Sequence, residues 1–352
     1  MLTTRYACQE LLDYAQALLH AAGLDAEKAQ AVAEILVEGD LLGHSTHGLA
    51  LLGPYLSELA GGSMRQAGEP ILLADAPAAV TWDGCRLPGP WLVLKAIELA
   101  IQRAASLGTC TVVIRRSHHI ACLAAYLKRV TDQGLMLVLA CSDPNTASVA
   151  PFGGLDPVFT PNPLAAGIPT NGAPVLLDVS TAATTNGLTN RLHKEGKNLP
   201  AQWVMDRHGV ASDDPGVLFT QPPGTILPLG GKDSGHKGYG LSLLVESLTG
   251  GLAGHGRADP REGWGATVYL QVINPRAFAG LESFKHQTSA VAAQCRASRP
   301  AQPGTPVRTP GENGLALSAQ AMQQGLALHP AIMPALGIWA AQLGIAIPTA
   351  LA

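Results

Sequence analysis

The chain has 352 residues, of which 47% are hydrophobic and 14% charged, and its formal net charge at pH 7 is -3. This length predicts about two domains of roughly 150 residues each. The small negative charge argues against nucleic acid or an anionic membrane as a partner. The six cysteines are scattered without a CxxC pair. They argue against a disulfide framework or zinc site and indicate a cytoplasmic protein with reduced thiols.

The N-terminal part is predicted to be helical. Its first residues include acidic side chains at helical spacing, which is not the pattern of a secretion signal. No uncharged apolar run approaches the ~20 residues needed to span a bilayer. Helices are predicted at residues 3–22, 26–41 and 49–59, the second capped by Asp25, followed by a β ribbon at 70–88 and a helix at 90–107.

Two pairs of histidines stand near predicted helix boundaries. His44 and His47 lie in a polar hinge between two N-terminal helices, and His118 and His119 follow a β-branched strand. Two such pairs are candidates for chemistry. Solvated or hydrogen-bonded histidines in ordinary turns are the alternative interpretation.

The second pair lies inside a strand–helix–strand pattern. The strand at 110–115, a helix at 120–133 and a buried strand at 135–141 have the order of a right-handed βαβ crossover. Open α/β sheets bind ligands at the turns that follow strands. The turn that carries His118 and His119 is therefore a candidate site.

A glycine-rich stretch from Leu227 to Gly251 precedes an apolar run with helical spacing. Glycine lets a ligand approach the backbone closely, and a helix N-terminus binds anions. His236 and Lys237 stand at the start of the predicted helix, which Ser234 or Gly235 would cap. The stretch predicts a site for an anionic ligand, although a solvated glycine-rich turn has the same composition.

The rest of the chain alternates strands, loops and helices. Asp178 lies in an apolar strand and is expected to be hydrogen-bonded if it is buried. No G-x-G-x-x-G follows a strand, so the Rossmann fingerprint is absent. The further expected segments are a strand at 175–181, a helix at 182–193, loops at 196–226, a helix to about 252, a strand at 266–273, a helix at 278–296, an exposed connector at 297–310, and helices at 316–327 and 330–343.

Seven segments in order resemble the type 2 malate/L-lactate dehydrogenases. This family of NAD(P)-dependent oxidoreductases also holds ureidoglycolate, sulfolactate, diketogulonate and piperideine-2-carboxylate enzymes. The matching segments span about residues 10–345. They are Thr46-His47-Gly48, Ser117-His118-His119, Pro151 to Gly154 with Asn162-Pro163-Leu164, Leu177 to Thr181, Leu199-Pro200 with Trp203 and Asp206, Gly230 to Gly240, and Pro310-Gly311-Glu312.

The resemblance implies an α/β fold that is not of the Rossmann type, with N-terminal helices and a cofactor-binding mixed-sheet domain. Residues 1–75 would pack with 76–140 and 280–352 as one α/β domain, and 141–279 would form the NAD(P)-binding domain. The resemblance also implies a homodimer with its active site near the subunit contact.

The implied activity is hydride transfer between NAD(P)H and C2 of a small 2-oxo or 2-hydroxy carboxylic acid. His119 matches the acid/base histidine, which suits both directions because its unperturbed pKa is about 6.5. It is expected to open a helix, whose dipole would favour neutral imidazole. His47 matches a second polar group beside the substrate, with Thr46 orienting its ring. The residues that match cofactor contacts are Ser142, Asp178, Val179, Ser180, His236, Lys237, Gly311, Glu312 and Asn313.

Two positions depart from the family pattern. Leu51 stands where the family usually has an arginine that grips the substrate carboxylate, and Arg115, Arg116 and Arg191 are candidates to replace that arginine. Leu188 stands where the imine-reductase branch has an aspartate proton donor, which weakens the alternative activity, reduction of a cyclic imine carboxylate.

Other choices stay open. The cofactor is NAD or NADP, and the protein is alternatively a non-catalytic NAD(P)-binding relative. A metal-dependent hydrolase or lyase would use His44, His47, His118 and His119, but no carboxylate stands beside them at a recognised ligand spacing. No metal site is therefore predicted.

Overall fold

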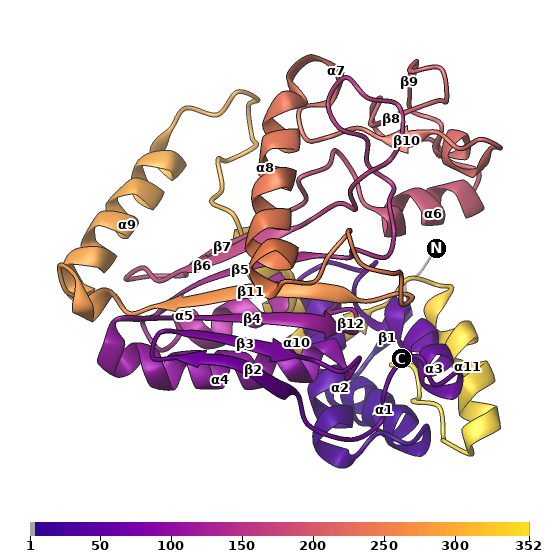
Figure 1. The fold of residues 1–352 in the computed structure, drawn as a ribbon, viewed down its shortest axis with the longest axis horizontal. Coiled ribbons are helices and arrows are strands. Elements are labelled where there is room, and N and C mark those ends of the chain that lie inside the picture. The colour runs from indigo at the N-terminus through magenta and orange to yellow at the C-terminus, as the bar shows by residue number, and fades with distance from the viewer. Residues whose placement is uncertain (1–3, 352) are drawn as a thin grey trace.

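One mixed sheet of seven strands forms the centre of a computed structural model, which describes residues 4–351 (Figure 1). The strand order is β2-β3-β4-β11-β5-β6-β7. β3 and β4 run parallel, and all other neighbouring pairs are antiparallel. The strands are β2 (Ile71–Ala76), β3 (Ala79–Asp83), β4 (Thr109–Ser117), β5 (Met136–Ser142), β6 (Leu164–Ile168), β7 (Val175–Val179) and β11 (Ala266–Ile273).

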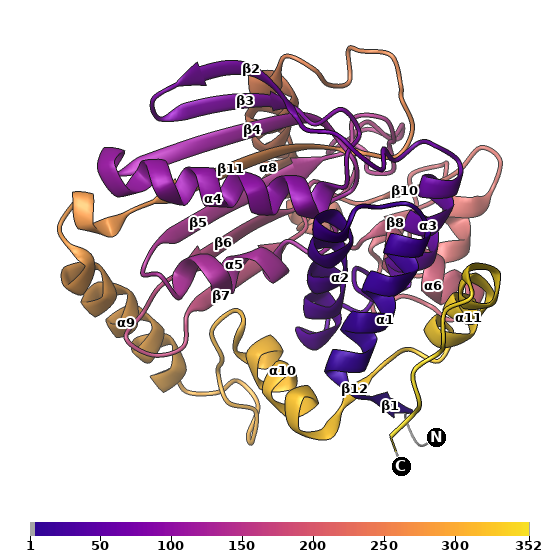
Figure 2. The same cartoon turned by 90° about the horizontal axis from the view of Figure 1, so that it is seen from below.

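Helices cover both faces of this sheet (Figures 1 and 2). α4 and α5 pack on one face beside the N-terminal helices, while α8 and the π-helical turn η3 (Ser247–Gly251) lie on the other. The helices are α1 (Cys8–Ala21), α2 (Ala26–Leu41), η1 (Leu49–Leu51), α3 (Leu52–Ala60), α4 (Gly89–Leu107), α5 (Ala124–Thr131), α6 (Asn186–Lys194), η2 (Pro215–Phe219), α7 (Gly231–Ser234), α8 (His236–Glu246), η4 (Pro275–Ala277), α9 (Leu281–Ala297), α10 (Glu312–Gln324) and α11 (Ile332–Leu343).

The largest hydrophobic core lies between the sheet and the N-terminal helices. Leu18 of α1 and Ile35 of α2 are fully buried there, and so are Val112 and Ile114 of β4. The alternation along β4 follows from the two-residue period of a strand, which sends every second side chain to the same face. The apolar faces of α1 and α2 are therefore covered within the chain.

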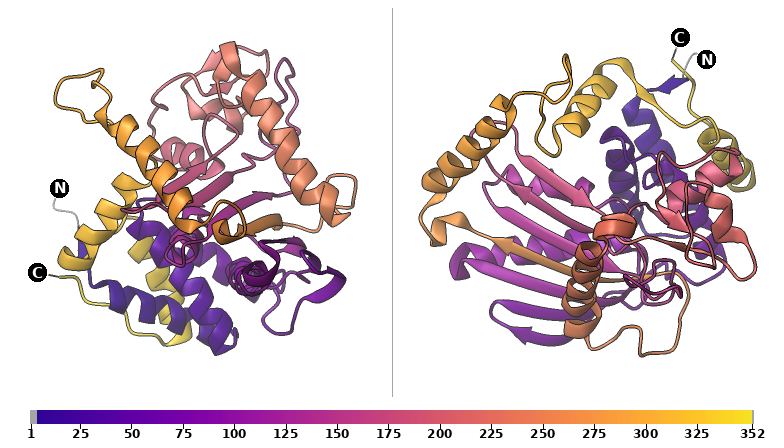
Figure 3. Two further views of the ribbon diagram at one scale, coloured as in Figure 1. Left: turned by 90° about the vertical axis from the view of Figure 1, so that its left-hand side faces the viewer. Right: turned by 90° about the horizontal axis from the view of Figure 1, so that it is seen from above.

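A smaller lobe stands above the sheet (Figure 3). It holds a three-stranded sheet and its own apolar cluster, which includes Val149, Phe159 and Ile226. The sequence analysis expected loops at 196–226, and three very short strands lie there instead. They are β8 (Val204–Met205), β9 (Ala211–Ser212) and β10 (Thr225–Ile226), while β1 (Arg5–Tyr6) pairs with β12 (Leu326–Ala327) elsewhere.

Most of the predicted elements are present, but several ends are shifted. The helix predicted from residue 3 begins at Cys8, and residues 1–3 lie outside the described chain. The helix predicted from Ile120 begins only at Ala124. Ala121 has φ 58°, a left-handed conformation that no right-handed helix contains. Asp25 caps α2 as predicted, since its side chain accepts from Lys28 N.

The predicted crossover is present in an extended form. The helix α5 connects β4 to β5, and these two strands run parallel. In the sheet, β11 lies between β4 and β5 and runs antiparallel to both. The sheet joins strands from both sides of the predicted boundary at 140, and the domain division stays a prediction. No helix within residues 4–351 is long and apolar enough to cross a membrane.

Candidate active site

A cavity of about 480 Å³ lies at one edge of the large sheet. β4, β5 and β7 run parallel to one another, so their carboxyl ends meet at this edge. Ser142 and Asp178 come from the ends of β5 and β7, and His119 follows β4. The prediction that a ligand site would lie at the turn after the first crossover strand agrees with this geometry.

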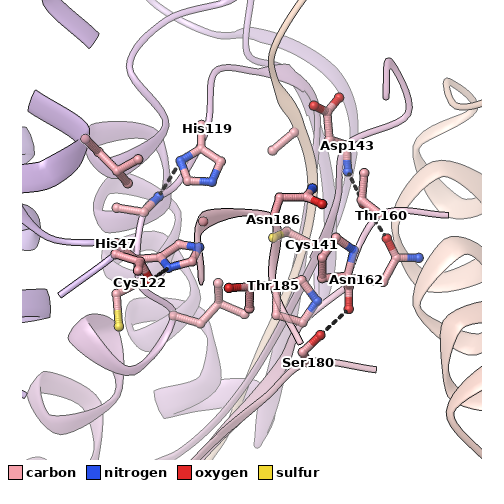
Figure 4. Close-up of a pocket in the computed structure, with 18 of the residues that line it drawn as sticks. His47, His119, Cys122, Cys141, Asp143, Thr160, Asn162, Ser180, Thr185 and Asn186 are labelled. Carbon is pink, nitrogen blue, oxygen red and sulfur yellow. Dashed lines mark hydrogen bonds between the residues drawn. The ribbon is translucent and has the colours of Figure 1, made fainter. Parts of the chain in front are cut away.

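His119 stands on the wall formed by the N-terminal part of the chain (Figure 4). Its Nδ1 lies 2.8 Å from Tyr55 Oη and accepts a 3.3 Å hydrogen bond from Ala121 N. Figure 4 shows the other ring nitrogen directed into the cavity. The ring also packs at 4.7 Å, centroid to centroid, against Trp264. Protein groups therefore hold Nδ1, while the other ring nitrogen faces the cavity.

Tyr55 supports His119 in either protonation state. Its hydroxyl, which lies on a fully buried side chain, is 3.2 Å from the His119 carbonyl as well as 2.8 Å from Nδ1. It donates to Nδ1 when that nitrogen is bare, and it accepts from a protonated Nδ1 while donating to the carbonyl. Sequence reasoning missed Tyr55, because nothing in the α3 pattern distinguishes it from a core aromatic residue.

The pKa of His119 lies well below its usual value because the ring is buried, with a smaller effect from His47 and His118 nearby. The expected direction is confirmed, but the expected cause is wrong. His119 precedes α5 by several residues and is not in its first turn, where a helix dipole acts. Burial keeps the imidazole neutral, which is the form that accepts a proton.

His47 stands beside His119, with ring centroids 6.0 Å apart. Its Nδ1 lies 2.9 Å from Thr46 Oγ1, so Thr46 orients the ring as predicted. Burial lowers the pKa of His47, and Asp178 opposes that shift. Thr46, His47 and His119, the three predicted catalytic residues, all line the cavity.

The hinge that carries His47 is held by Asp40 and Arg191. Asp40 of α2 accepts a 2.7 Å hydrogen bond from Leu49 N. Burial raises the pKa of Asp40 to about 7. Arg191 of α6 donates to the Ser45 carbonyl at 2.6 Å and to its hydroxyl at 2.9 Å. Neither Asp40 nor Arg191 lines the cavity, so both act by holding the hinge.

Hydroxyl and amide side chains form the opposite wall, together with Asp143 (Figure 4). Thr160 donates to Asn162 at 2.7 Å, and Asn162 donates to Glu246 at 2.8 Å. Ser180 donates to the Pro161 carbonyl at 3.0 Å. This wall suits hydroxyl and carboxamide groups of a ligand better than it suits an anion.

Asp178 is hydrogen-bonded, as expected. It accepts from Ala124 N at 2.8 Å and from Cys122 Sγ at 3.7 Å. Ligand atoms of His44, Cys122 and Asp178 lie within 4.8 Å of one another, and among residues 4–351 this is the one group of three that could hold a metal. Burial, and then Asp178, raises the pKa of the Cys122 thiol, which disfavours the thiolate that a metal needs. The metal-dependent alternative used His44, His47, His118 and His119, and of these four only His44 belongs to this group.

His118 is buried and does not line the cavity. Its Nε2 lies 3.3 Å from Glu58 Oε2. Burial lowers the pKa of His118 to about 4, although Glu58 opposes the shift. This histidine is a core residue, in contrast to its neighbour.

The predicted cofactor residues divide into two groups. Ser142, Asp178 and Ser180 line the cavity. The others lie outside its lining, and they are Val179, His236, Lys237, Gly311, Glu312 and Asn313. The glycines of the 230–240 stretch are mostly closed by the chain's own backbone, since a Cβ on Gly238 would meet Leu229 N at 2.3 Å and Thr181 O at 2.6 Å. At Gly238 the missing side chain therefore lets another part of the protein backbone, and not a ligand, come close.

The three arginines considered as replacements for a carboxylate clamp also lie outside the cavity lining. Arg115 and Arg116 bind Asp83 at 3.0 and 3.3 Å, and Arg116 also binds Glu262. Leu51, at the end of η1, does line the cavity.

A profile of the malate/L-lactate dehydrogenases matches residues 6–337. The chain belongs to this family. The L-lactate dehydrogenase of Cupriavidus necator is 32% identical to it over 96% of this chain and 97% of that protein. The malate dehydrogenase structure from Pyrococcus horikoshii has a TM-score of 0.88 at 25% identity and covers 98% of this chain and 97% of that one. The Δ1-piperideine-2-carboxylate reductase of Pseudomonas syringae has a TM-score of 0.83 at 28% identity, covering 96% and 100%.

Membership in the malate/L-lactate dehydrogenase family makes the chain an oxidoreductase, and the resemblance inferred from its seven segments is confirmed. The mixed seven-stranded sheet agrees with the structures of these relatives.

Proposed function

We propose that this protein transfers hydride between NAD(P)H and C2 of a small 2-oxo or 2-hydroxy carboxylic acid. The observation that carries the proposal is the single cavity lined by His119 and His47, in a chain of the malate/L-lactate dehydrogenase family. A bound nicotinamide would supply or accept the hydride, and the protein must position the substrate and move one proton.

His119 is the proposed proton donor and acceptor at the substrate oxygen. Its cavity-facing nitrogen is unhindered, and Tyr55 accommodates both ring states. His47, oriented by Thr46, is the proposed second hydrogen-bonding group on the substrate. The lowered pKa of both rings keeps them neutral at pH 7. In the tautomer that carries its proton on Nδ1, with Tyr55 Oη accepting from that nitrogen, the cavity-facing nitrogen of His119 is the base that accepts a proton in the oxidation direction.

The wall that carries Thr160 and Asn162 fits the nicotinamide end of the cofactor. Hydroxyls and amides of Ser142, Thr160, Asn162 and Ser180 suit a carboxamide and ribose hydroxyls. The neighbour of Ser180, Thr181, accepts a 2.8 Å hydrogen bond from Leu229 N, so the glycine-rich stretch adjoins this wall. We propose that the phosphates lie toward Lys237 and His236, at the start of α8, where both side chains are exposed.

The mixed sheet, in place of a Rossmann motif, is proposed to hold the nucleotide. Val179 and the segment Gly311–Asn313 remain proposed cofactor contacts at the outer side of β7, where Leu176 N donates to the Pro310 carbonyl. The structure leaves NAD and NADP equally open.

A homodimer in the cytoplasm remains part of the proposal. The apolar faces of α1 and α2, which motivated the dimer, are buried in the chain's own core. Exposed apolar side chains lie instead on the edge strand β2, where Ile71 and Leu72 are 56% and 55% exposed. An exposed apolar edge strand of this kind favours association.

Reduction of a cyclic imine carboxylate is the second candidate, and the likeness to the Pseudomonas reductase favours it. Leu188 supplies no proton donor, so His119 would have to serve that reaction as well. A screen of NADH and NADPH oxidation with 2-oxo acids and cyclic imine carboxylates tests the proposal. Oxidation with 2-oxo acids is the expected result. Cofactor binding without turnover of any of these compounds would instead indicate a non-catalytic relative.

A further inference from the structure

The cavity that holds the proposed chemistry has an unusual balance of charge for a carboxylate site. None of its lining residues, within the described chain 4–351, is a lysine or an arginine. Two acidic side chains, Asp143 and Asp178, line it instead. His47 and His119 add no positive charge, because burial lowers their pKa values.

The arginines around the cavity bind other groups. Arg257 donates to the Asp143 and Thr146 carbonyls and to Glu246. Arg86 donates to the Ser63 and Trp264 carbonyls. Both terminal nitrogens of Arg191 donate hydrogen bonds to Ser45, one to its carbonyl at 2.6 Å and one to its hydroxyl at 2.9 Å. Arg115 and Arg116 are bound to Asp83. Bringing any of these arginines to a substrate would break the hydrogen bonds or ion pairs that it makes here. The donors that the described chain itself offers a substrate in this cavity are therefore neutral, such as the amides of Asn186 and Asn190 on its lining.

Part of the wall is apolar. Leu51, Ala121, Leu123 and Trp264 all line the cavity, and the ring of Trp264 packs against that of His119 with centroids 4.7 Å apart. A substrate carbon that His119 reaches therefore has apolar surface close by. Apolar surface removed from water by such a wall stabilises a bound alkyl group by roughly 25 cal/mol per Å², whereas an unpaired carboxylate in the same place is penalised.

We infer that the substrate is a 2-hydroxy or 2-oxo monocarboxylate with an apolar side chain, and that Leu51 excludes dicarboxylates. This inference rests on the proposed function. One carboxylate is held by neutral donors, and the alkyl group packs on the Leu51 wall. A second carboxylate would meet Leu51 without a counter-ion, in a cavity that already holds Asp143 and Asp178.

The test compares two substrates of similar shape. L-malate and L-2-hydroxy-4-methylpentanoate differ in that a carboxylate replaces an isopropyl group of similar branching. Values of kcat/KM are measured for both acids with NAD⁺ and NADP⁺. The wild-type protein is expected to prefer the methylpentanoate by on the order of 100-fold, the discrimination expected when a charged group is left unpaired. Dissociation constants of both acids in the presence of NADH give the same comparison without turnover.

Leu51→Arg is expected to move the preference toward malate by at least about tenfold, because it supplies the missing counter-ion. Leu51→Met is the matched control of similar volume without charge, and its ratio should stay within about threefold of wild type. Leu51→Gln serves if the arginine variant does not fold. With its added amide donor it should move the ratio in the same direction by a smaller factor.

Each outcome bears on a different statement. A wild-type preference for malate, or an unchanged ratio in a folded Leu51→Arg protein, overturns the inference and leaves the proposed function in place. No turnover of either acid, or of the 2-oxo acids in the screen above, overturns the proposed function and the inference together.

Discussion

Replacing His119 by alanine is expected to lower turnover by on the order of 10²–10⁴ while NAD(P)H still binds. That loss corresponds to about 2.7–5.4 kcal/mol of transition-state stabilisation. The substitution leaves Tyr55 Oη with a hydrogen-bond partner, because the backbone carbonyl of residue 119, at 3.2 Å, is still present in the variant. The hydroxyl is not left without a hydrogen bond, so the variant should fold.

His118→Asn is the matched control in the adjacent position. His118 is buried and directed at Glu58, and an asparagine amide can still donate to that carboxylate. Turnover should stay within about fivefold of wild type, since His118 does not line the cavity. Its effect should appear in stability instead. The folded-state pKa is lowered to about 4, so the folded protein binds fewer protons than the unfolded chain and loses stability as pH falls from about 6.5 to 4.

The assay pairs single-turnover kinetics with NADH fluorescence titration and thermal melts from pH 4 to 7. The His119→Ala protein is expected to turn over slowly and still bind the cofactor. The His118→Asn protein is expected to be active, with a melting temperature that falls less than that of the wild type as pH decreases from 7 to 4. If His118→Asn abolishes turnover and His119→Ala does not, the assignment of the acid/base role is wrong.

Three other substitutions and one mass measurement test separate parts of the proposal. Tyr55→Phe should lower kcat by roughly 10–100-fold and alter its pH profile, as expected when a bond to a charged ring is lost; an unchanged profile would give Tyr55 a packing role only. Lys237→Ala should weaken NAD(P)H by roughly tenfold or more through one lost charge-assisted contact, and unchanged affinity in a folded variant would remove Lys237 from the cofactor site. Asp40, with its pKa raised to about 7 by burial, makes the folded state bind the extra proton, so wild-type stability should fall as pH rises from about 4 through 7. Asp40→Asn, which keeps an acceptor for Leu49 N, should lose this dependence, worth about 4 kcal/mol at most, and parallel melting curves for the two proteins would contradict it. Light scattering at micromolar concentration should give the mass of a dimer, and a monomer would contradict the proposed assembly.

The sequence by itself determined the family and most of the elements. Helices such as α4 (Gly89–Leu107) and strands such as β11 (Ala266–Ile273) were predicted closely, because their periodicity is a local property. The predicted catalytic residues Thr46, His47 and His119 meet in one cavity. That agreement came from the ordered motifs, since two histidine pairs more than seventy residues apart carry no distance information of their own.

Only the tertiary structure separated two adjacent histidines by environment. His118 is in the core against Glu58, while His119 faces the cavity and is held by Tyr55 from another helix. The left-handed backbone at Ala121 delays α5, and this removed the expected helix-dipole effect. The sequence likewise did not determine the environment of Leu51. Whether a cation lies near this side chain depends on which groups the arginines elsewhere in the chain bind. Burial, partner choice and charge balance are set by contacts between segments far apart in the chain, and a local pattern does not encode them.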